Sequence, residues 1–295
     1  MTIAVSGSSG MIGSALRAEL VRLGHRPVRL VRRSPGAEEI QWDPSKGILD
    51  AASLEGMDAV IHLAGAGIGD RRWNEAYKAE LVDSRVQPTA LLAKTLASLD
   101  RPPAVFVSAS AIGYYGDRGD QTLTEDSPAG TGFLPDLVTK WEAATSPAAE
   151  AEIRTVSIRT GVVYSKAGGA LPKLLPLFRF GLGGPMGNGR QYVSWISLDD
   201  EVRAIVHLLS ADLRGAVNLT APNPVTNKQQ AVALGKALHR PVVLPVPAFG
   251  PRLLLGTEMA NALLFDSARV LPTRLGESGF EFNHKTIDEA FAAIV

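Results

Sequence analysis

The stretch TIAVSGSSGMIGSAL, residues 2–16, decides the fold of this chain. A short run of apolar and β-branched residues leads into a glycine-rich turn, and the spacing of apolar residues after the turn is typical of a helix. Gly7 permits a tight turn, Gly10 lets the backbone approach a pyrophosphate, and Gly13 lets the helix pack closely on the strand. The stretch therefore predicts a strand, a phosphate-binding loop and a helix whose free amide groups face an anion.

The predicted phosphate site includes the residues of the turn and of the first helical turn. They are Gly7, Ser9, Gly10, Met11, Ile12 and Gly13. In this context the loop is typical of dinucleotide binding.

The sequence on either side of this stretch continues the same pattern. Apolar runs at residues 28–32, 59–65, 104–110 and 154–164 alternate with segments of helical spacing. Strands that are apolar on both faces and separated by helices form a parallel sheet covered on both sides. We therefore predict an α/β chain with a doubly wound parallel-sheet Rossmann fold.

The sequence predicts two domains, with an insertion in the first of them. Residues 1–222 form the nucleotide-binding domain, which ends with a capped helix and a strand and holds a glycine- and proline-rich insertion at residues 165–195. Loops of this length within a compact domain are usually functional, so we expect the insertion on the substrate side. Residues 223–295 form a smaller C-terminal α/β substrate lobe.

The end of the second strand predicts which dinucleotide binds. A site that prefers NAD places an acidic side chain there, whereas this chain has Arg32 and Arg33. A guanidinium pairs well with a 2′-phosphate, and the sequence therefore predicts NADP(H). The alternative is two solvated arginines with no role in binding.

The strand at residues 59–65 ends in small residues, which allow a cofactor to pass close to the backbone. Because ligands of open parallel sheets bind at the carboxyl ends of strands, Leu63, Ala64 and Gly65 are expected to line the cleft. His62 lies inside the strand, where we expect a packed core histidine rather than a base.

Composition limits the partners of this chain. Thirty basic residues balance thirty acidic residues among 295, so no global field attracts nucleic acid or an anionic membrane. The chain has no cysteine, which excludes disulfides, thiol nucleophiles and zinc–thiolate sites. We read no signal peptide and no membrane span, and expect a cytoplasmic protein with a small-molecule substrate and no metal site. The oligomeric state stays open, with a homodimer among the alternatives.

Several motifs together carry a family resemblance over nearly the whole chain. They are GSSGMIG, VRRSP, WDPSKG, DAVIHLAG, RRWNEAYK, DSRV, SASAIGYYG, TKWEAA, RTGVVYS, NLTAPNPVTN, LPVPAF and the long block from residue 169 to residue 200. The chain resembles an extended short-chain dehydrogenase/reductase, and within that superfamily the atypical sugar-nucleotide epimerase-like branch with its characteristic C-terminal domain.

The resemblance implies a catalytic serine at Ser110, with Ser108 two residues earlier on the same strand near the cofactor. It also implies a tyrosine four residues before a lysine, and Lys140 is the lysine of the matching segment. No Tyr-x-x-x-Lys pair exists anywhere in the chain. Tyr114 and Tyr115 are therefore the candidate relocated acids, because an arginine nearby lowers the pKa of a tyrosine. The alternative is that both rings only pack.

The same resemblance points to further residues near the cofactor. Arg85 stands where many extended members carry an asparagine, and a fixed cation there suits an anionic group or the cofactor. Arg159, Thr160 and Gly161 resemble the loop on the nicotinamide side. Each of these residues has a purely structural alternative, such as a salt bridge or a strand end.

The sequence leaves three hypotheses for the function. The first is an NADP(H)-dependent oxidoreductase or epimerase-like enzyme that uses Ser110, with Tyr114 or Tyr115 as acid and Lys140 in support. The second is an NADPH-binding regulatory or scaffold protein without turnover, and the missing tyrosine favours it. The third is a strict nucleoside-diphosphate-sugar epimerase, which Arg32 opposes because such enzymes usually hold NAD.

Overall fold

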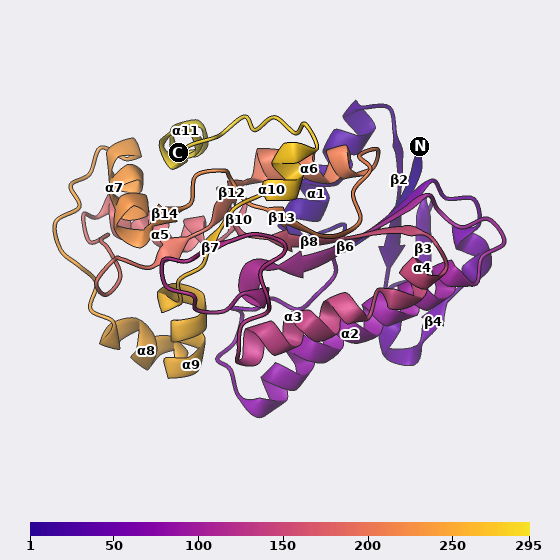
Figure 1. Ribbon diagram of the computed structural model, residues 1–295, viewed down its shortest axis with the longest axis horizontal. Coiled ribbons are helices and arrows are strands. Elements are labelled where there is room, and N and C mark those ends of the chain that lie inside the picture. The colour runs from indigo at the N-terminus through magenta and orange to yellow at the C-terminus, as the bar shows by residue number, and fades with distance from the viewer.

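The computed structural model describes all 295 residues, and an eight-stranded sheet forms its centre (Figure 1). The order across the sheet is β13-β8-β6-β5-β1-β2-β3-β4. All neighbours pair in parallel except β3 and β4, which are antiparallel. The strands are β1 (Thr2–Ser6), β2 (Arg26–Val31), β3 (Glu39–Asp43), β4 (Ile48–Leu49), β5 (Ala59–His62), β6 (Val105–Ala111), β8 (Arg154–Thr160) and β13 (Gly215–Leu219).

This strand order confirms the predicted doubly wound fold. The chain runs outward from β1 through β2 and β3, and then returns to place β5 on the other side of β1. The strand order therefore reverses between β1 and β5. In open parallel sheets ligands bind outside the carboxyl ends of the strands at such a point.

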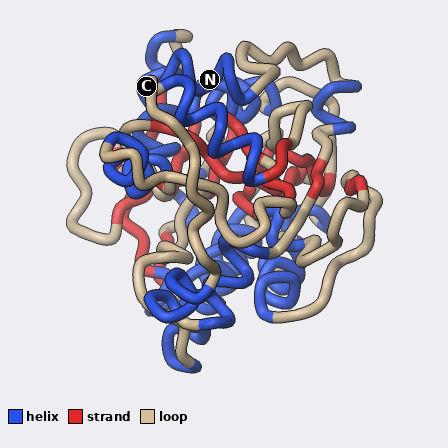
Figure 2. The backbone as a smooth tube through the Cα atoms, turned by 90° about the vertical axis from the view of Figure 1, so that its left-hand side faces the viewer, coloured by secondary structure: helices blue, strands red, loops and turns tan.

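Helices cover both faces of this sheet, as Figures 1 and 2 show. One face packs against α1, α6 and α10, and the other packs against α2 and α4. The helices of the chain are α1 (Met11–Arg22), α2 (Glu75–Ala97), α3 (Phe133–Ala143), α4 (Ser146–Glu150), α5 (Leu171–Arg179), α6 (Leu198–Leu208), α7 (Asn227–Ala237), α8 (Phe249–Leu255), α9 (Thr257–Ala260), α10 (Thr273–Glu277) and α11 (Ile287–Ile294).

The alternation of side chains along β1 explains this layering. Ile3 and Val5 point to the face that α1 covers, and Ala4 points to the opposite face. All three residues are fully buried, because successive residues of a strand face opposite sides and both sides are covered here. An apolar run without polar gaps is therefore what this strand requires.

A second core lies beside the sheet. The strands β9 (Val162–Ser165), β10 (Gly168–Gly169) and β12 (Trp195–Ser197) form a small sheet. Tyr164 and Trp195 from this sheet are buried among side chains of α5, α7 and α11. Two two-stranded ribbons complete the structure, β11 (Tyr192–Val193) with β14 (Val225–Thr226) and β7 (Thr122–Leu123) with β15 (Arg269–Val270). Residues from the predicted insertion and the predicted C-terminal lobe thus share one core.

The structure corrects two details of the sequence interpretation. Residues 154–164 are not one strand, because the chain leaves the main sheet at Gly161. The amide of Gly161 donates to Leu219 in that sheet, and the amide of Val162 donates to Ser194 outside it. The strand β3, which lies between β2 and the edge strand β4, was not predicted. In addition, no helix of the structure has the length and apolar character needed to cross a membrane.

Candidate functional site

The glycine loop has the geometry of a pyrophosphate site. Gly7 has a φ of +63°, and a Cβ on it would lie 2.6 Å from the backbone of Leu63. A Cβ on Gly13 would lie 2.3 Å from the carbonyl oxygen of Gly7, so the loop and α1 approach too closely for any side chain. The helix α1 begins after Gly10 with no side-chain cap and no acidic residue in its first turn. Its first amide groups are therefore available to an anion.

The two arginines after β2 differ in their contacts. Arg33 donates two hydrogen bonds of 2.7 Å to the carboxylate of Glu39, which also pairs with Arg29 at 3.1 Å. Arg32 is exposed and makes no hydrogen bond or ion pair within the protein. A guanidinium that is already bound bidentately has little left to offer a ligand. Arg32 is therefore the arginine that is available to a 2′-phosphate.

The residues expected to line the cleft after β5 follow that strand directly. Leu63 and Ala64 are partly buried and Gly65 is exposed. The contact between Gly7 and Leu63 places this turn beside the glycine loop, as the strand order requires. His62 is fully buried and hydrogen-bonds with Ser6, and burial lowers its pKa to about 3. It is a packed core histidine, as predicted.

A cavity of about 700 Å³ lies at the same end of the sheet. Its wall includes Ile12 at the start of α1, Ser110 on β6 and Thr160 on β8. Side chains of α3 and of the C-terminal residues 258–268 enclose it from the other side. Ile12, in the first turn of the helix that follows the glycine loop, and Ser110 thus line one cavity, which is the arrangement that a dinucleotide-dependent site needs.

Ser110 belongs to a network that the sequence did not reveal. Its hydroxyl donates to Oε1 of Glu142 on α3 at 2.6 Å. The guanidinium of Arg159 on β8 binds both oxygens of Glu142 at 2.8 Å. Arg159 is buried and the Glu142 side chain is 17% exposed, so the pair is shielded from solvent. Burial lowers the pKa of Arg159, but its bonds to Glu142 outweigh burial and raise it.

Tyr114 and Tyr115 do not fit the role of relocated acid. Neither tyrosine lines the cavity. Tyr115 is fully buried, and its hydroxyl donates to Asn218 at 2.7 Å and accepts from Arg159 at 3.0 Å. Burial raises the pKa of Tyr115 and outweighs the opposing effect of Arg159. The ring of Tyr114 packs on the Arg159 guanidinium at 3.4 Å from the ring centroid. Both tyrosines therefore contact the arginine rather than the cavity.

The face of α3 explains why Lys140 is not at the cavity. Val138 lines the cavity and Glu142 lies one helical turn later on the same side. Lys140 stands between them in the sequence, and it is exposed and absent from the cavity wall. The signal for Glu142 in the sequence is thus its helical spacing from Val138.

Arg85 lines the cavity but is already bonded within the protein. Its Nη1 donates to the carbonyl oxygen of Leu81 at 3.0 Å, and its Nη2 donates to that of Ala66 at 2.9 Å. The guanidinium lies 5.2 Å from the ring centroid of Trp141. Burial lowers the pKa of Arg85 to about 10. Arg85 therefore braces the loop after β5.

The predicted loop after β8 forms part of the cavity wall. Thr160 and Gly161 line it, and the Thr160 hydroxyl donates to Oε1 of Glu201 at 2.8 Å. Glu201 is fully buried and its Oε2 has no partner. Burial raises the pKa of Glu201 to about 8, against the lowering effect of the Thr160 bond. Ser108 is buried inside β6 and does not reach the cavity.

The predicted insertion contributes little to this cavity. None of residues 165–191 lines it, and its wall takes Tyr192, Val193 and Ser194 from the end of the insertion. The predicted C-terminal lobe contributes more, with seven residues: Glu258, Asn261, Ala262, Leu263, Leu264, Asp266 and Ala268.

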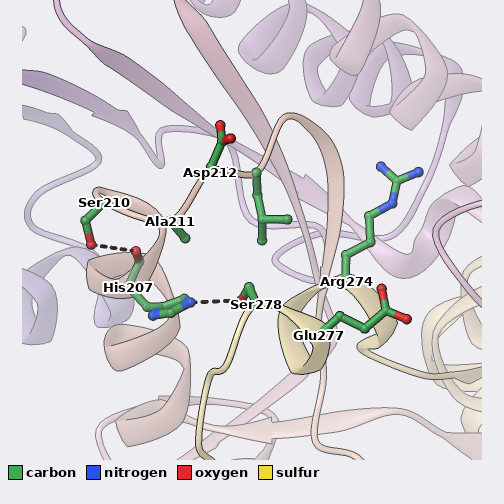
Figure 3. Close-up of a pocket in the computed structure, with 8 residues that line it drawn as sticks. His207, Ser210, Ala211, Asp212, Arg274, Glu277 and Ser278 are labelled. Carbon is green, nitrogen blue, oxygen red and sulfur yellow. Dashed lines mark hydrogen bonds between the residues drawn. The ribbon is translucent and has the colours of Figure 1, made fainter.

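A separate hollow of about 400 Å³ lies between the end of α6 and α10 (Figure 3). His207 hydrogen-bonds there with the Ser278 hydroxyl at 2.8 Å, which fastens the C-terminal segment to α6. None of the predicted site residues lines this hollow.

The comparison with protein families agrees with this geometry. A family model described as the NAD dependent epimerase/dehydratase family matches residues 3–219, which contain the glycine loop, Ser110 and Arg159. The chain belongs to this family. A second model, a domain of unknown function called DUF1731, matches residues 246–294.

Members of the epimerase family extend the likeness over the whole chain. The epimerase family protein ML0860 of Mycobacterium leprae is 46% identical over 292 residues, which cover 98% of this chain and 94% of that protein. The human epimerase family protein SDR39U1 is 38% identical over 299 residues, with complete coverage of both. The crystal structure of human SDR39U1 (isoform 2) with NADPH superposes with a TM-score of 0.92 at 35% identity, covering 100% and 99% of the two chains. These matches confirm the family resemblance and the fold.

Proposed function

We propose that this chain is an NADP(H)-dependent oxidoreductase or epimerase-like enzyme that interconverts an alcohol and a carbonyl compound. The observation that carries the proposal is the Ser110–Glu142–Arg159 network at the wall of a cavity that also meets the phosphate loop. The NADPH in the structure of human SDR39U1 supports the choice of cofactor, as does unpaired Arg32 in this chain. When bound, the nicotinamide supplies or accepts the hydride.

The chain's own residues are arranged to move the proton. In the oxidation direction the substrate hydroxyl donates its proton to Oγ of Ser110, while Ser110 donates its own proton to the Glu142 carboxylate. In reduction the same path runs in reverse, so that Glu142 returns a proton through Ser110 to the substrate oxygen. Arg159 holds both oxygens of Glu142 and thereby fixes the carboxylate in reach of Ser110. A carboxylate reached through a serine thus replaces the usual tyrosine and lysine.

The alternative is a protein that binds NADPH without turnover. It is favoured by the absence of a Tyr-x-x-x-Lys pair and by the fact that the Ser110 hydroxyl is already bonded. In that case the network only joins α3 to β6 and β8. The two functions differ in what a substitution of Glu142 changes.

The test uses titration calorimetry with NADPH and then single-turnover assays with deuterium-labelled NADPH and a panel of ketones and aldehydes. We expect Glu142→Gln and Ser110→Ala to keep NADPH affinity and to lower deuterium transfer by about 10² or more. Glu150→Gln, on the short helix after α3, is the matched control and should not change transfer. Full transfer in Glu142→Gln would exclude the proton path, and NADPH binding without transfer to any carbonyl compound would favour the alternative. The cytoplasmic location and the oligomeric state stay predictions.

A further inference from the structure

The cavity wall has almost no positive charge to offer a substrate. Of its 31 lining residues 18 are hydrophobic, and only Arg85, Glu258 and Asp266 carry charged side chains. Both terminal nitrogens of Arg85 already donate to backbone carbonyl groups. Arg85 is therefore the single cation of the wall, and it is held in place by backbone carbonyl groups rather than by a carboxylate.

The two carboxylates of the wall differ in their partners. Glu258 pairs with Lys78 at 2.8 Å, so its charge is compensated within the protein. Asp266 makes no side-chain hydrogen bond and no ion pair, although it is only partly exposed. Burial raises the pKa of Asp266, and the nearby Asp117 raises it further. Asp266 is thus the carboxylate of the wall whose hydrogen-bonding capacity is unused.

Aromatic and aliphatic side chains make up most of the remaining wall. Trp73 and Phe133 lie edge to face with centroids 5.0 Å apart, and the Trp73 indole donates to the carbonyl oxygen of Ile68. Leu134 on α3 and Leu263 from the C-terminal residues continue this surface. The wall is therefore formed in advance for apolar atoms, and the indole N–H of Trp73 is already satisfied.

We propose that the substrate is a largely apolar carbonyl compound, or the corresponding alcohol, which carries no phosphate and presents an amino or hydroxyl group to Asp266. This proposal rests on the proposed function. In the reductive direction the carbonyl carbon gains a hydride and its oxygen gains a proton, so the substrate takes up two electrons while NADPH becomes NADP⁺. The C-terminal residues thus select the substrate through Asp266.

The same wall opposes a nucleoside-diphosphate sugar. A diphosphate brings two negative charges, which proteins normally neutralise with arginine, lysine or free amide groups. Here the wall offers one cation, Arg85, which already donates to two backbone carbonyl groups, together with the unpaired carboxylate of Asp266, and an anion placed next to that carboxylate is unfavourable. Although this chain belongs to a family described as epimerases, the unpaired carboxylate of its cavity wall opposes the binding of a nucleoside-diphosphate sugar.

The test measures binding to the NADPH-saturated protein by calorimetry with three ketones that differ in one substituent. They are para-aminomethyl acetophenone, para-methyl acetophenone and para-carboxy acetophenone, and UDP-glucose is the diphosphate probe. We expect the aminomethyl compound to bind about tenfold tighter than the methyl compound, and the carboxy compound and UDP-glucose to bind more weakly than both. Asp266→Asn should remove the advantage of the amino group.

The control is Asp288→Asn, the same change on an exposed carboxylate of α11 that pairs with Lys236. It should leave the binding order unchanged, and both variants should keep NADPH affinity. Tighter binding of UDP-glucose or of the carboxy compound, an unchanged order in Asp266→Asn, or no binding of any ketone would overturn the substrate proposal. Failure to bind NADPH in the first step would instead overturn the proposed function, which keeps the two failures apart.

Discussion

Arg32 and Arg33 stand side by side in the sequence, and the structure predicts that only one of them selects the cofactor. Arg32 is exposed and has no partner within the protein, whereas Arg33 is held by two 2.7 Å hydrogen bonds to Glu39. We therefore expect Arg32→Ala to weaken NADPH binding and Arg33→Ala to leave it nearly unchanged. In the second variant Glu39 stays in place through its pairing with Arg29.

The expected size follows from the exposure of Arg32. A hydrogen bond to a charged group contributes about 1.5 to 3 kcal/mol, and solvent screening at an exposed site favours the lower half of that range. The dissociation constant for NADPH should thus rise about 10- to 40-fold in Arg32→Ala. For Arg33→Ala the change should stay within about threefold.

Calorimetric titration of both variants with NADPH and with NADH checks this reasoning. NADH has no 2′-phosphate, so its affinity should be the same in the native protein and in Arg32→Ala. The preference for NADPH should also decrease as ionic strength rises. If Arg32→Ala keeps the native preference, or if Arg33→Ala loses as much affinity as Arg32→Ala, the assignment of the free arginine is wrong.

Three further predictions concern the loop and the buried groups. Gly13→Ala should abolish NADPH binding in calorimetry, because its Cβ would lie 2.3 Å from the Gly7 carbonyl oxygen. Tyr115→Phe should lower the free energy of unfolding in urea by about 1 to 3 kcal/mol, because Asn218 loses a buried partner, and should leave NADPH affinity unchanged; loss of affinity would point to a direct role. Because the pKa of Glu201 is about 8 in the folded state and about 4.5 when unfolded, stability is lost as pH rises through this window. Glu201→Gln should therefore gain thermal stability over the native protein between pH 5 and pH 8 in thermal melts, and a constant difference would contradict the buried proton.

The fold could be predicted from the sequence because its first strands are apolar on both faces. The interiors of β1 and β5 have no polar residue and require cover on both sides, whereas β6 and β8 carry polar residues on one face, among them Ser110 and Arg159. The strand β3, which lies between β2 and the edge strand β4, escaped prediction because EIQWD mixes charged, polar and apolar residues. The switch of sheets at Gly161 depends on contacts with residues 194 and 219, and a local pattern does not contain those contacts.

The site was predictable in its parts but not in its connections. The glycine loop follows from its pattern after a strand, and Ser110 follows from the family resemblance; Ser110 and Ile12, which comes just after the loop, line the cavity. The family motif points to Lys140, whereas the side chain that reaches Ser110 is Glu142, which helical spacing places on the same side of α3 as Val138. The pairing of Glu142 with Arg159 joins α3 to β8 across 17 positions of sequence, and no motif encodes that distance.

The Glu142–Arg159 pair also determines how its own role must be tested. Arg159 uses Nε, Nη1 and Nη2 in hydrogen bonds, and its partners Glu142 and Tyr115 lie on different elements. Removing one member of a buried ion pair leaves the other charge unpaired, at a cost of about 3 to 5 kcal/mol. Loss of activity in Glu142→Ala would therefore confuse lost structure with lost chemistry. Glu142→Gln also leaves the Arg159 charge unpaired, but it keeps the length and one acceptor oxygen of the side chain and cannot take a proton from Ser110, so its free energy of unfolding must be measured beside its deuterium transfer. Because Ser110 alone of this network lines the cavity, the carboxylate acts on a substrate only through the serine, and Ser110→Ala must then lose the same proton step.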